Sequence, residues 1–389
     1  MKRLTVLAAV STAVCFPAAA QEDWDAWEAK WTGEAAVVLA PGADEVTLYR
    51  FGLGFDANRV LDNGMEVGTV VRLDAEQDYG QRDGFSGIVS DPAPGAYALA
   101  GAFSGLGRSS GFEDHGVRGT LQTAYLYAEG GYGEVRLGRD EGVAKRFAQG
   151  APSLFSTLSL HAPRLDPDGG AIVRTDHDLT GPAAKISYAT PRIVGLRGGL
   201  SFTPEADAGG LDRDPARTLP GTAALSLRNA AEASLSFNHR FRESGVRLRG
   251  SGGWSRADVE AAPTAPAAYG EVDTWSFGAN AEWKDTVIGA SWIGSDNGFD
   301  SVSGDYTAWT FGLTQKAFGL TWGAEYGEAT DDAAGVEGES WRAGIGRSLN
   351  DHAAFALGYR KDKLAPRGSI ATPRSLGGEG IVVEITLSR

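Results

Sequence analysis

The stretch GEVRLGRDEG, from Gly133 to Gly142, contains the pattern that decides the fold of this 389-residue chain. Apolar and polar residues alternate along it with the two-residue period of a β-strand that has one apolar face. From Asp140 to Ala183 no comparable alternation follows, although alternating runs resume beyond that point. Connections of this length are uncommon inside compact domains, and they usually carry a function or are disordered. The sequence therefore predicts a strand that leads into a long connection with a role of its own.

The start of the chain has the features of an export signal. A charged beginning is followed by an apolar core from Leu4 to Phe16 and by a small-residue cleavage site at Ala18–Ala20. The apolar core is too short for a membrane-spanning helix, which needs roughly 18 or more apolar residues. The single cysteine, Cys15, lies inside this segment, so the exported chain would hold no disulfide. We expect residues 1–20 to be a signal peptide and residues 21–389 to form one domain.

The composition indicates a β-protein and argues against several functions. The chain carries 36 Lys and Arg against 50 Asp and Glu, a net charge of −14, whereas a nucleic-acid-binding surface needs a basic stripe. With 42% hydrophobic residues and ten tryptophans, the chain is also unlike a disordered one. Its 54 glycines and the scarcity of helical patterns favour β structure, either soluble or in an outer membrane.

Sixteen alternating runs bounded by turn residues predict sixteen strands. They are 31–39, 46–56, 63–76, 117–129, 132–139, 184–190, 193–203, 230–241, 245–256, 272–283, 285–294, 305–315, 318–328, 338–348, 352–362 and 379–388. Every proline beyond the export signal falls outside these runs, as strand hydrogen bonding requires. One face of each run is apolar and the other is charged or small. A soluble sandwich and a membrane barrel both explain such faces.

The lengths of the connections separate these two folds. Short links at 57–63, 130–131, 190–192, 242–244, 284, 316–317 and 349–351 alternate with long ones at 77–116, 140–183, 204–229, 257–271, 295–304, 329–337 and 363–378. Only 40–45 is short on the long side. A barrel with short periplasmic turns and long external loops produces this alternation, whereas a sandwich has no reason to sort its loops. The sequence therefore predicts an all-β fold, a transmembrane antiparallel β-barrel of sixteen strands.

Aromatic residues support the membrane barrel. Seven of them lie near strand ends on the apolar face, where a barrel carries its girdles at headgroup level. They are Trp254, Trp275, Trp283, Trp309, Trp322, Trp341 and Tyr359.

Three segments resemble Gram-negative general porins, and the similarity is closest to those of the alphaproteobacterial type. GEVRLGRDEG resembles the end of the fifth porin strand, Lys185–Pro204 resembles the hairpin after the long loop, and Leu61–Glu76 resembles the hairpin that enters the third strand. The resemblance implies a homotrimer in the outer membrane, surrounded by lipid and lipopolysaccharide. It also implies that the third loop, 140–183, folds into the lumen and that 77–116 reaches toward a neighbouring subunit.

One feature departs from that family. Its members usually end on an aromatic residue, which the outer-membrane assembly machinery reads, whereas this chain ends on Arg389. The departure puts the efficiency of assembly in doubt more than the fold.

The resemblance places acids on the inward loop and arginines on the facing wall. Matching residues are Asp140, Glu141, Asp166 and Asp168 on the loop, Arg50 and Arg72 on the wall, Arg136 near the loop root and Arg174 near the loop end. Structural alternatives remain for several of them. Asp166 and Asp168 would serve equally as turn residues around Pro167 or as ligands of a Ca²⁺ ion. Arg50 and Arg72 would also suit a wide part of the lumen with no special role.

Enzymatic function is not indicated. The chain has no G-x-S-x-G elbow, and its histidines show no metal-ligand spacing. They are His115, His161, His177, His239 and His352. We expect a porin, not an enzyme, without a cofactor, that passes small hydrophilic solutes and ions. The acidic balance predicts a weak cation preference. The alternatives are a channel selective for sugars or dicarboxylates on the same barrel, and an exported soluble β-protein that binds glycans.

Overall fold

The computed structural model describes residues 27–77, 100–106, 118–208, 225–261, 268–300, 303–367 and 376–389. Within these ranges the chain forms sixteen strands and one short helix. They are β1 (Glu28–Leu39), β2 (Thr47–Val60), β3 (Glu66–Gln77), β4 (Arg118–Gly130), β5 (Gly133–Asp140), α1 (Val143–Phe147), β6 (Ala183–Ala189), β7 (Leu196–Asp207), β8 (Leu225–Arg240), β9 (Arg247–Ala261), β10 (Glu271–Trp283), β11 (Thr286–Ser295), β12 (Tyr306–Ala317), β13 (Leu320–Asp331), β14 (Val336–Asn350), β15 (Ala353–Pro366) and β16 (Leu376–Ser388).

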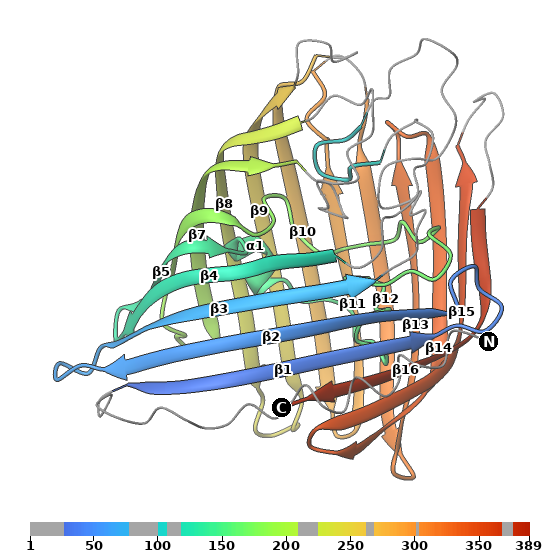
Figure 1. The fold of residues 1–389 in the computed structure, drawn as a ribbon, viewed down its shortest axis with the longest axis horizontal. Helices are drawn as coiled ribbons and strands as arrows, with labels where there is room; N and C mark the ends of the chain where they lie inside the picture. Colours follow the sequence, from blue (N-terminus) through green and yellow to red (C-terminus); the bar gives the residue numbers. More distant parts are fainter. Residues whose placement is uncertain are drawn as a thin grey trace.

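The strands close into one barrel in which each strand pairs antiparallel with its neighbours in sequence (Figure 1). β1 and β16 complete the ring, with the register running from Glu34 opposite Ser388 to Leu39 opposite Val383. The backbone amide of Arg389 extends this pairing by donating to the carbonyl oxygen of Gly33 at 2.9 Å. The predicted fold class and the number of strands are confirmed. No helix in the described ranges is long and apolar enough to cross a membrane.

One rim of the barrel carries the long connections, and we call it the long-loop rim. At this rim, strands extend beyond the predicted runs. β8 begins at Leu225 and β9 ends at Ala261, each about five residues beyond the predicted runs 230–241 and 245–256. Their extra residues carry charges on the outer face, where Arg228 pairs with Glu205 at 2.8 Å and with Glu260 at 3.0 Å. The sequence pattern identifies a strand by an apolar outer face, and here the outward residues are charged, so the pattern ends before the strand does.

Two prolines lie inside strands, so the prediction that none does is wrong. Pro366 ends β15, and Pro204 lies within β7. The residues on either side of Pro204 pair with Ala230 and Arg228, which leaves the proline opposite Asn229. Asn229 has a φ of +50° and sits at an irregularity in the β8–β9 register, so no ladder hydrogen bond is required of the proline.

The two faces of the barrel wall differ as predicted. On β10, Thr274 and Ser276 point inward and are buried, whereas Trp275 and Phe277 point outward and are exposed. The seven predicted girdle aromatics all lie on outward positions of their strands, and two pairs of them are in contact. The rings of Trp254 and Trp275 are 6.2 Å apart. Those of Trp341 and Tyr359 are 5.3 Å apart. A lipid-facing surface accounts for this pattern.

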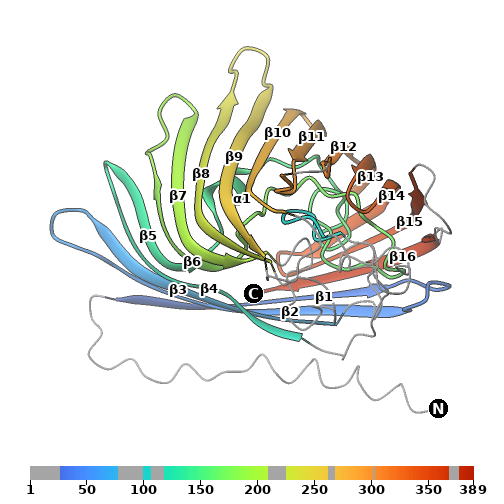
Figure 2. The same cartoon turned by 90° about the horizontal axis from the view of Figure 1, so that it is seen from above.

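Two predicted segments fall partly or wholly outside the described residues. The signal peptide at 1–20 lies outside them, as does most of the connection 77–116, which was expected to reach a neighbouring subunit. The part of that connection that the structure describes, residues 100–106, lies inside the chain's own barrel (Figure 2), and the expected contact with a neighbouring subunit stays a prediction.

Candidate functional site

The connection between β5 and β6, residues 141–182, enters the lumen, as predicted (Figure 2). We call it the long loop. Its first turn is α1, which lies against β7, β8 and β9. The backbone amide of Val143 donates to the Ser201 hydroxyl at 3.1 Å, and that of Ala144 donates to the Glu232 carboxylate at 3.2 Å. These inward side chains of β7 and β8 satisfy amides that the start of a helix leaves without partners.

The loop then crosses to the opposite wall. The Ser153 hydroxyl donates to Glu325 of β13 at 2.6 Å. Further on, the backbone amides of Ser156 and Thr157 donate to the two carboxylate oxygens of Glu384 on β16, at 2.7 and 2.9 Å. Both hydroxyls of these two residues donate to the same carboxylate, at 2.8 and 2.6 Å. The far end of the loop is therefore held by the last strand of the barrel.

The loop returns along the inner wall. Thr175 and Ser291 of β11 share a hydroxyl hydrogen bond of 2.6 Å. The imidazole nitrogens of His177 lie 2.7 Å from the hydroxyls of Ser276 on β10 and Ser255 on β9. Together with the outward crossing, these contacts cover the inward faces of the strands from β8 to β13. The loop also packs on Val38 of β1 and Leu48 of β2, and the part of the lumen next to other inward positions of β1–β5 stays open.

A hollow of about 390 Å³ occupies that uncovered part, between the root of the long loop and the inner wall of β1–β5. We call it the passage. Five arginines and four carboxylates line it. The arginines are Arg50, Arg72, Arg136, Arg146 and Arg164. The carboxylates are Glu34, Asp74, Asp140 and Glu141. Charges crowded between low-dielectric walls focus the field that a solute meets in a pore.

Five of the eight predicted site residues line the passage. They are Arg50, Arg72, Arg136, Asp140 and Glu141. The other three lie elsewhere on the loop. Asp166 accepts the backbone amides of Asp168 and Ala171 at 3.2 and 2.8 Å, as a turn residue does. Asp168 accepts the backbone amide of Asp44 at 3.0 Å and pairs with Arg360 of β15.

Arg174 and the loop root meet in a buried charged cluster beside the passage. Arg174 pairs with Asp176 at 2.8 Å. The Lys145 ammonium lies 3.1 Å from Glu141, 2.8 Å from Asp178 and 3.5 Å from Asp176. Among the residues placed here, no group of three or more histidine, cysteine or acidic side chains is arranged to hold a metal ion.

The electrostatics of this cluster follow from its burial. Burial alone would lower the pKa of Lys145, but the carboxylates of Asp176, Asp178 and Glu141 raise it above its ordinary value. Burial would raise the pKa of Asp176, but Lys145 and Arg174 lower it to about 2. For His177, burial lowers the pKa to about 4, so the imidazole is neutral at physiological pH. The cluster is a set of fixed charges that joins the root of the long loop to its returning end.

Two of the four carboxylates in the passage are buried in ion pairs. Asp74 is buried between Arg50 at 2.6 Å and Arg164 at 3.6 Å, and Asp140 is buried beside Arg136 at 3.1 Å. Arg72, by contrast, keeps 48% of its side chain exposed and has one partner, Asp56, at 3.7 Å. A solute in the passage therefore meets the exposed guanidinium of Arg72, and among the four carboxylates only Glu34, with 56% of its side chain exposed, is comparably accessible.

Four charged lining residues were missed from the sequence. Asp74 was within reach, because it shares the polar face of β3 with Arg72. Glu34 lies on a predicted strand but next to apolar neighbours that gave its face no polar character. Arg146 and Arg164 lie in the long loop, where no residue period relates position to direction, and no sequence signal marks them.

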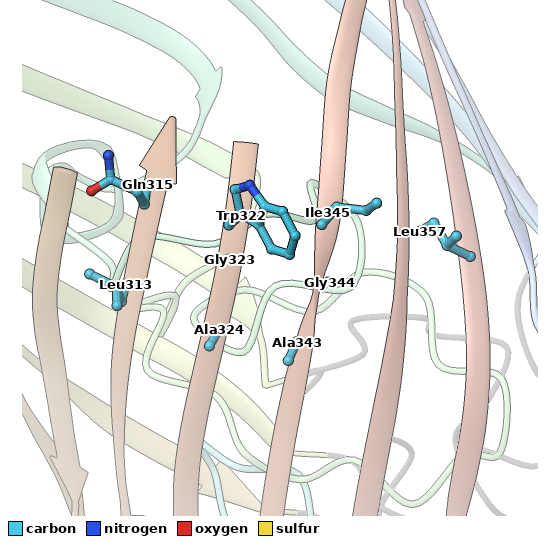
Figure 3. A pocket seen from close by; sticks show the side chains of 9 residues that line it. All are labelled: Leu313, Gln315, Trp322, Gly323, Ala324, Ala343, Gly344, Ile345 and Leu357. Carbon is cyan, nitrogen blue, oxygen red and sulfur yellow. The ribbon is translucent and has the colours of Figure 1, made fainter. Parts of the chain in front are cut away.

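A second hollow, of about 460 Å³, lies on the outer wall and does not belong to the channel (Figure 3). Leu313, Trp322, Ile345 and Leu357 rim it, over a floor that includes Ala324 and Ala343. These side chains occupy the outward, lipid-facing positions of β12–β15.

Comparison with known proteins agrees with this geometry. The profile of the Gram-negative porin family matches residues 4–364. No curated protein sequence gave a significant match. Several solved structures share the fold. The anion-selective porin from Comamonas acidovorans is 16% identical, with a TM-score of 0.55 over 93% of this chain and 100% of its own.

Two further structures resemble the chain to a similar degree. OmpF of Salmonella typhi is 11% identical, with a TM-score of 0.58 over 93% of this chain and 97% of its own. The trimer form of OmpT from Vibrio cholerae is 13% identical, with a TM-score of 0.53 over 94% and 100% of the two chains. The alphaproteobacterial type expected from the motifs stays a prediction. The chain belongs to the Gram-negative porin family, and it is an outer-membrane channel protein.

Proposed function

We propose that this porin is a general diffusion channel through which small hydrophilic solutes and ions move passively, without catalysis. The observation that carries the proposal is the passage itself. It lies along one side of the lumen, polar side chains from five strands and the long loop line it, and the long loop contacts the opposite wall at β11 and β13. A passage of this kind selects by size and by field.

Ion selectivity is the part of the proposal on which two physical arguments differ. The net charge of −14 predicts a weak cation preference, because an acidic protein raises the local cation concentration. The passage, however, carries five arginines against four carboxylates, and Asp74 and Asp140 are buried in ion pairs. Since the field at the narrowest point weighs most on permeation, we propose a weak anion preference in place of the cation preference.

A solute-selective channel is the second candidate, and the arginines of the passage favour dicarboxylates over sugars for it. Guanidinium groups bind carboxylates in a bidentate geometry, and they stay charged when crowded together. Three strands and the long loop bring four arginines to the same hollow, namely Arg50, Arg72, Arg136 and Arg164. A dicarboxylate with a binding site there would block the ion current at low concentration. A general channel would pass the dicarboxylate together with the ions, without such a block.

We also propose a homotrimer embedded among lipid and lipopolysaccharide. The exposed aromatic and aliphatic outer face of the barrel supports contact with lipid. The trimer form of the Vibrio cholerae protein supports the oligomer only through the shared fold.

Planar-bilayer recording tests these proposals together. Purified protein is added to one side, and the reversal potential is measured in a tenfold KCl gradient. A small potential of the sign for anions supports the passage argument, and a potential of the sign for cations restores the argument from net charge. If the folded protein gives no discrete conductance steps, the proposed channel function is refuted.

A further inference from the structure

Residues 100–106 form a short buried segment inside the barrel, which we call the inner segment. It belongs to the connection between β3 and β4. Phe103 is 1% exposed and Leu106 is fully buried. In Figure 2 the segment lies within the ring of strands, beside the long loop. A segment at the mouth of a channel would ordinarily be solvated, so its burial calls for a physical cause.

Asn297, which follows β11, anchors the inner segment through both of its oxygen atoms. Its side-chain oxygen accepts the backbone amides of Phe103 and Ser104 at 3.2 and 2.9 Å, and its own carbonyl oxygen accepts that of Ala102 at 3.0 Å. Its amide group donates to the Gly304 carbonyl at 2.6 Å. The residue has a φ of +57°, a conformation that asparagine tolerates better than most.

Close backbone approach makes this anchor specific. A Cβ atom at Gly101 would lie 2.3 Å from the side chain of Asn297, so only glycine fits there. On the other side, the Tyr269 hydroxyl donates to the carbonyl oxygen of Ala100 at 2.8 Å. The inner segment is therefore held at its start and in its middle.

Tyr306 of β12 joins the inner segment to the long loop. Its ring lies 5.7 Å from that of Phe103. Its hydroxyl donates to the carbonyl oxygens of Ile172 and Arg174, both at 2.9 Å. One buried side chain thus contacts both segments that enter the lumen.

The barrel wall behind these contacts is apolar, contrary to the polar lining of a water-filled channel. Inward positions on four consecutive strands are occupied by Leu227, Val259, Val272 and Ile293, which are buried in one cluster with the inner segment. Those strands are β8, β9, β10 and β11. On this side, the lumen near the long-loop rim is filled by a small hydrophobic core.

We propose that the inner segment is a second constriction element, docked by Asn297, that closes the β8–β12 side of the lumen near the long-loop rim and confines solutes to the passage along β1–β5. The proposal rests on the proposed channel function. It assigns Asn297 and Phe103 a part in setting the size limit, although neither lines the passage. Pore cross-section then depends on how firmly this segment stays docked.

Cysteine accessibility combined with conductance tests the proposal. Ser104→Cys is made in a chain whose single natural cysteine is replaced by Cys15→Ser, and a charged methanethiosulfonate reagent is added to open channels. Docked, the thiol is buried and resists the reagent. With Asn297→Ala added, we expect the reaction to accelerate by at least about tenfold, because local opening governs access to a buried group.

Conductance supplies the second readout. We expect Asn297→Ala to raise single-channel conductance by roughly 1.5-fold, since conductance follows the open cross-section, and to admit larger sugars in liposome swelling. Asn63→Ala, the same substitution on an exposed short turn, is the matched control and should change neither readout. Phe103→Ala, which keeps every hydrogen bond of Asn297, provides a second variant if Asn297→Ala fails to fold, as judged by heat-modifiable gel mobility.

The outcomes separate this proposal from the channel function. Rapid modification of Ser104→Cys with Asn297 intact would overturn the docked segment. Faster modification with unchanged conductance and size limit would overturn its role as a constriction. In both cases the parent protein still conducts. A parent protein that is folded but does not conduct would instead refute the proposed function.

Discussion

Glu384, on the last strand of the barrel, accepts both the backbone amide and the hydroxyl of Thr157, at 2.9 and 2.6 Å, from the far end of the long loop. Its other oxygen does the same for Ser156. A carboxylate that accepts four hydrogen bonds in a buried place uses nearly all its acceptor capacity. One side chain of β16 therefore holds the far end of the long loop.

Glu384→Gln should release the far end of the loop. The amide group of glutamine would face donors, so at least one buried donor loses its acceptor, at a cost of about 1–3 kcal/mol. We expect the unfolding free energy to fall by about that amount and single-channel current to fluctuate more. Denaturant unfolding and planar-bilayer recording measure the two effects.

Glu379→Gln is the matched control for that substitution. It lies on the same strand but on the outer face, paired with Lys361 in an exposed salt bridge of 3.0 Å. Exposed pairs contribute about 0–1 kcal/mol, so this variant should keep the parent stability and a quiet current. Equal effects from the two variants would show that Glu384 does not hold the loop.

Substitutions at two neighbouring inward positions of β3 should shift ion selectivity in opposite directions. Arg72→Gln removes an exposed cation, and Asp74→Asn frees Arg50 and Arg164 from their shared acid. A unit charge about 5 Å from a permeating ion in water contributes about 0.8 kcal/mol, or roughly fourfold in local concentration. We expect the anion-to-cation permeability ratio to fall in the first variant and rise in the second, by up to that factor.

The control for the selectivity shifts is Arg256→Gln. Arg256 has a similar exposure, 45%, but it lies on the outer face of β9 and pairs with Glu271 and Asp273. Reversal potentials in a KCl gradient should not move for this variant. A shift as large as that of Arg72→Gln would mean that charge anywhere on the barrel sets the selectivity.

The strands could be predicted because successive side chains of each strand point alternately toward lipid and toward the water-filled lumen. In GEVRLGRDEG, Leu137 must face lipid and Arg136 must face the lumen, and a two-residue period records that requirement. The same logic found Arg50 and Arg72. It failed near the long-loop rim, where Leu227 and Val259 point inward and are covered by the inner segment, so that an apolar side chain no longer marks the lipid face.

The loop residues could not be sorted by sequence because no period relates them to the wall. Asp166 and Asp168 are two positions apart, yet Asp166 caps a turn and Asp168 binds β15. Asp140 and Glu141 reach the passage because they are next to a strand end whose direction is known. Arg164 reaches it after the chain has crossed the lumen, and only the folded path determines that.

Acid should weaken the attachment of the loop through His177. Its pKa in the folded protein is about 4, below the ordinary value near 6.5, because burial disfavours the charged form. Between these values the unfolded chain binds more protons than the folded one, so stability falls as the pH falls from about 6.5 to about 4, by up to about 3 kcal/mol. The carboxylates facing this ring are Asp176, Asp178 and Glu232.

The pH effect is measured by denaturant unfolding at several pH values from 7 to 4. His177→Gln keeps a polar group between Ser255 and Ser276 but cannot titrate, so its stability should depend less steeply on pH than that of the parent. His352→Gln, on an exposed short turn, should leave the parent slope unchanged. Parallel pH curves for parent and His177→Gln would assign the acid effect to other groups.

Asp362 is the group whose loss should cost the barrel wall most. It lies fully buried between Arg342 at 3.2 Å and Arg360 at 3.1 Å, and it accepts the Ser340 hydroxyl at 2.6 Å. Asp362→Asn keeps the shape of the side chain but removes the carboxylate that Arg342 and Arg360 share. Arg360 keeps its ion pair with Asp168, whereas Arg342 loses the ion pair described here. Removing one partner of a buried ion pair typically costs about 3–5 kcal/mol, and we expect a loss of that size in unfolding free energy.

Asp351→Asn, on the exposed turn before β15, is the control and should cost about 0.5 kcal/mol or less. The double variant Asp362→Leu with Arg342→Leu should regain part of the loss, because removing a buried pair together avoids the unpaired charge. If Asp362→Asn unfolds at the same denaturant concentration as Asp351→Asn, the cluster is solvated and contributes nothing to the wall.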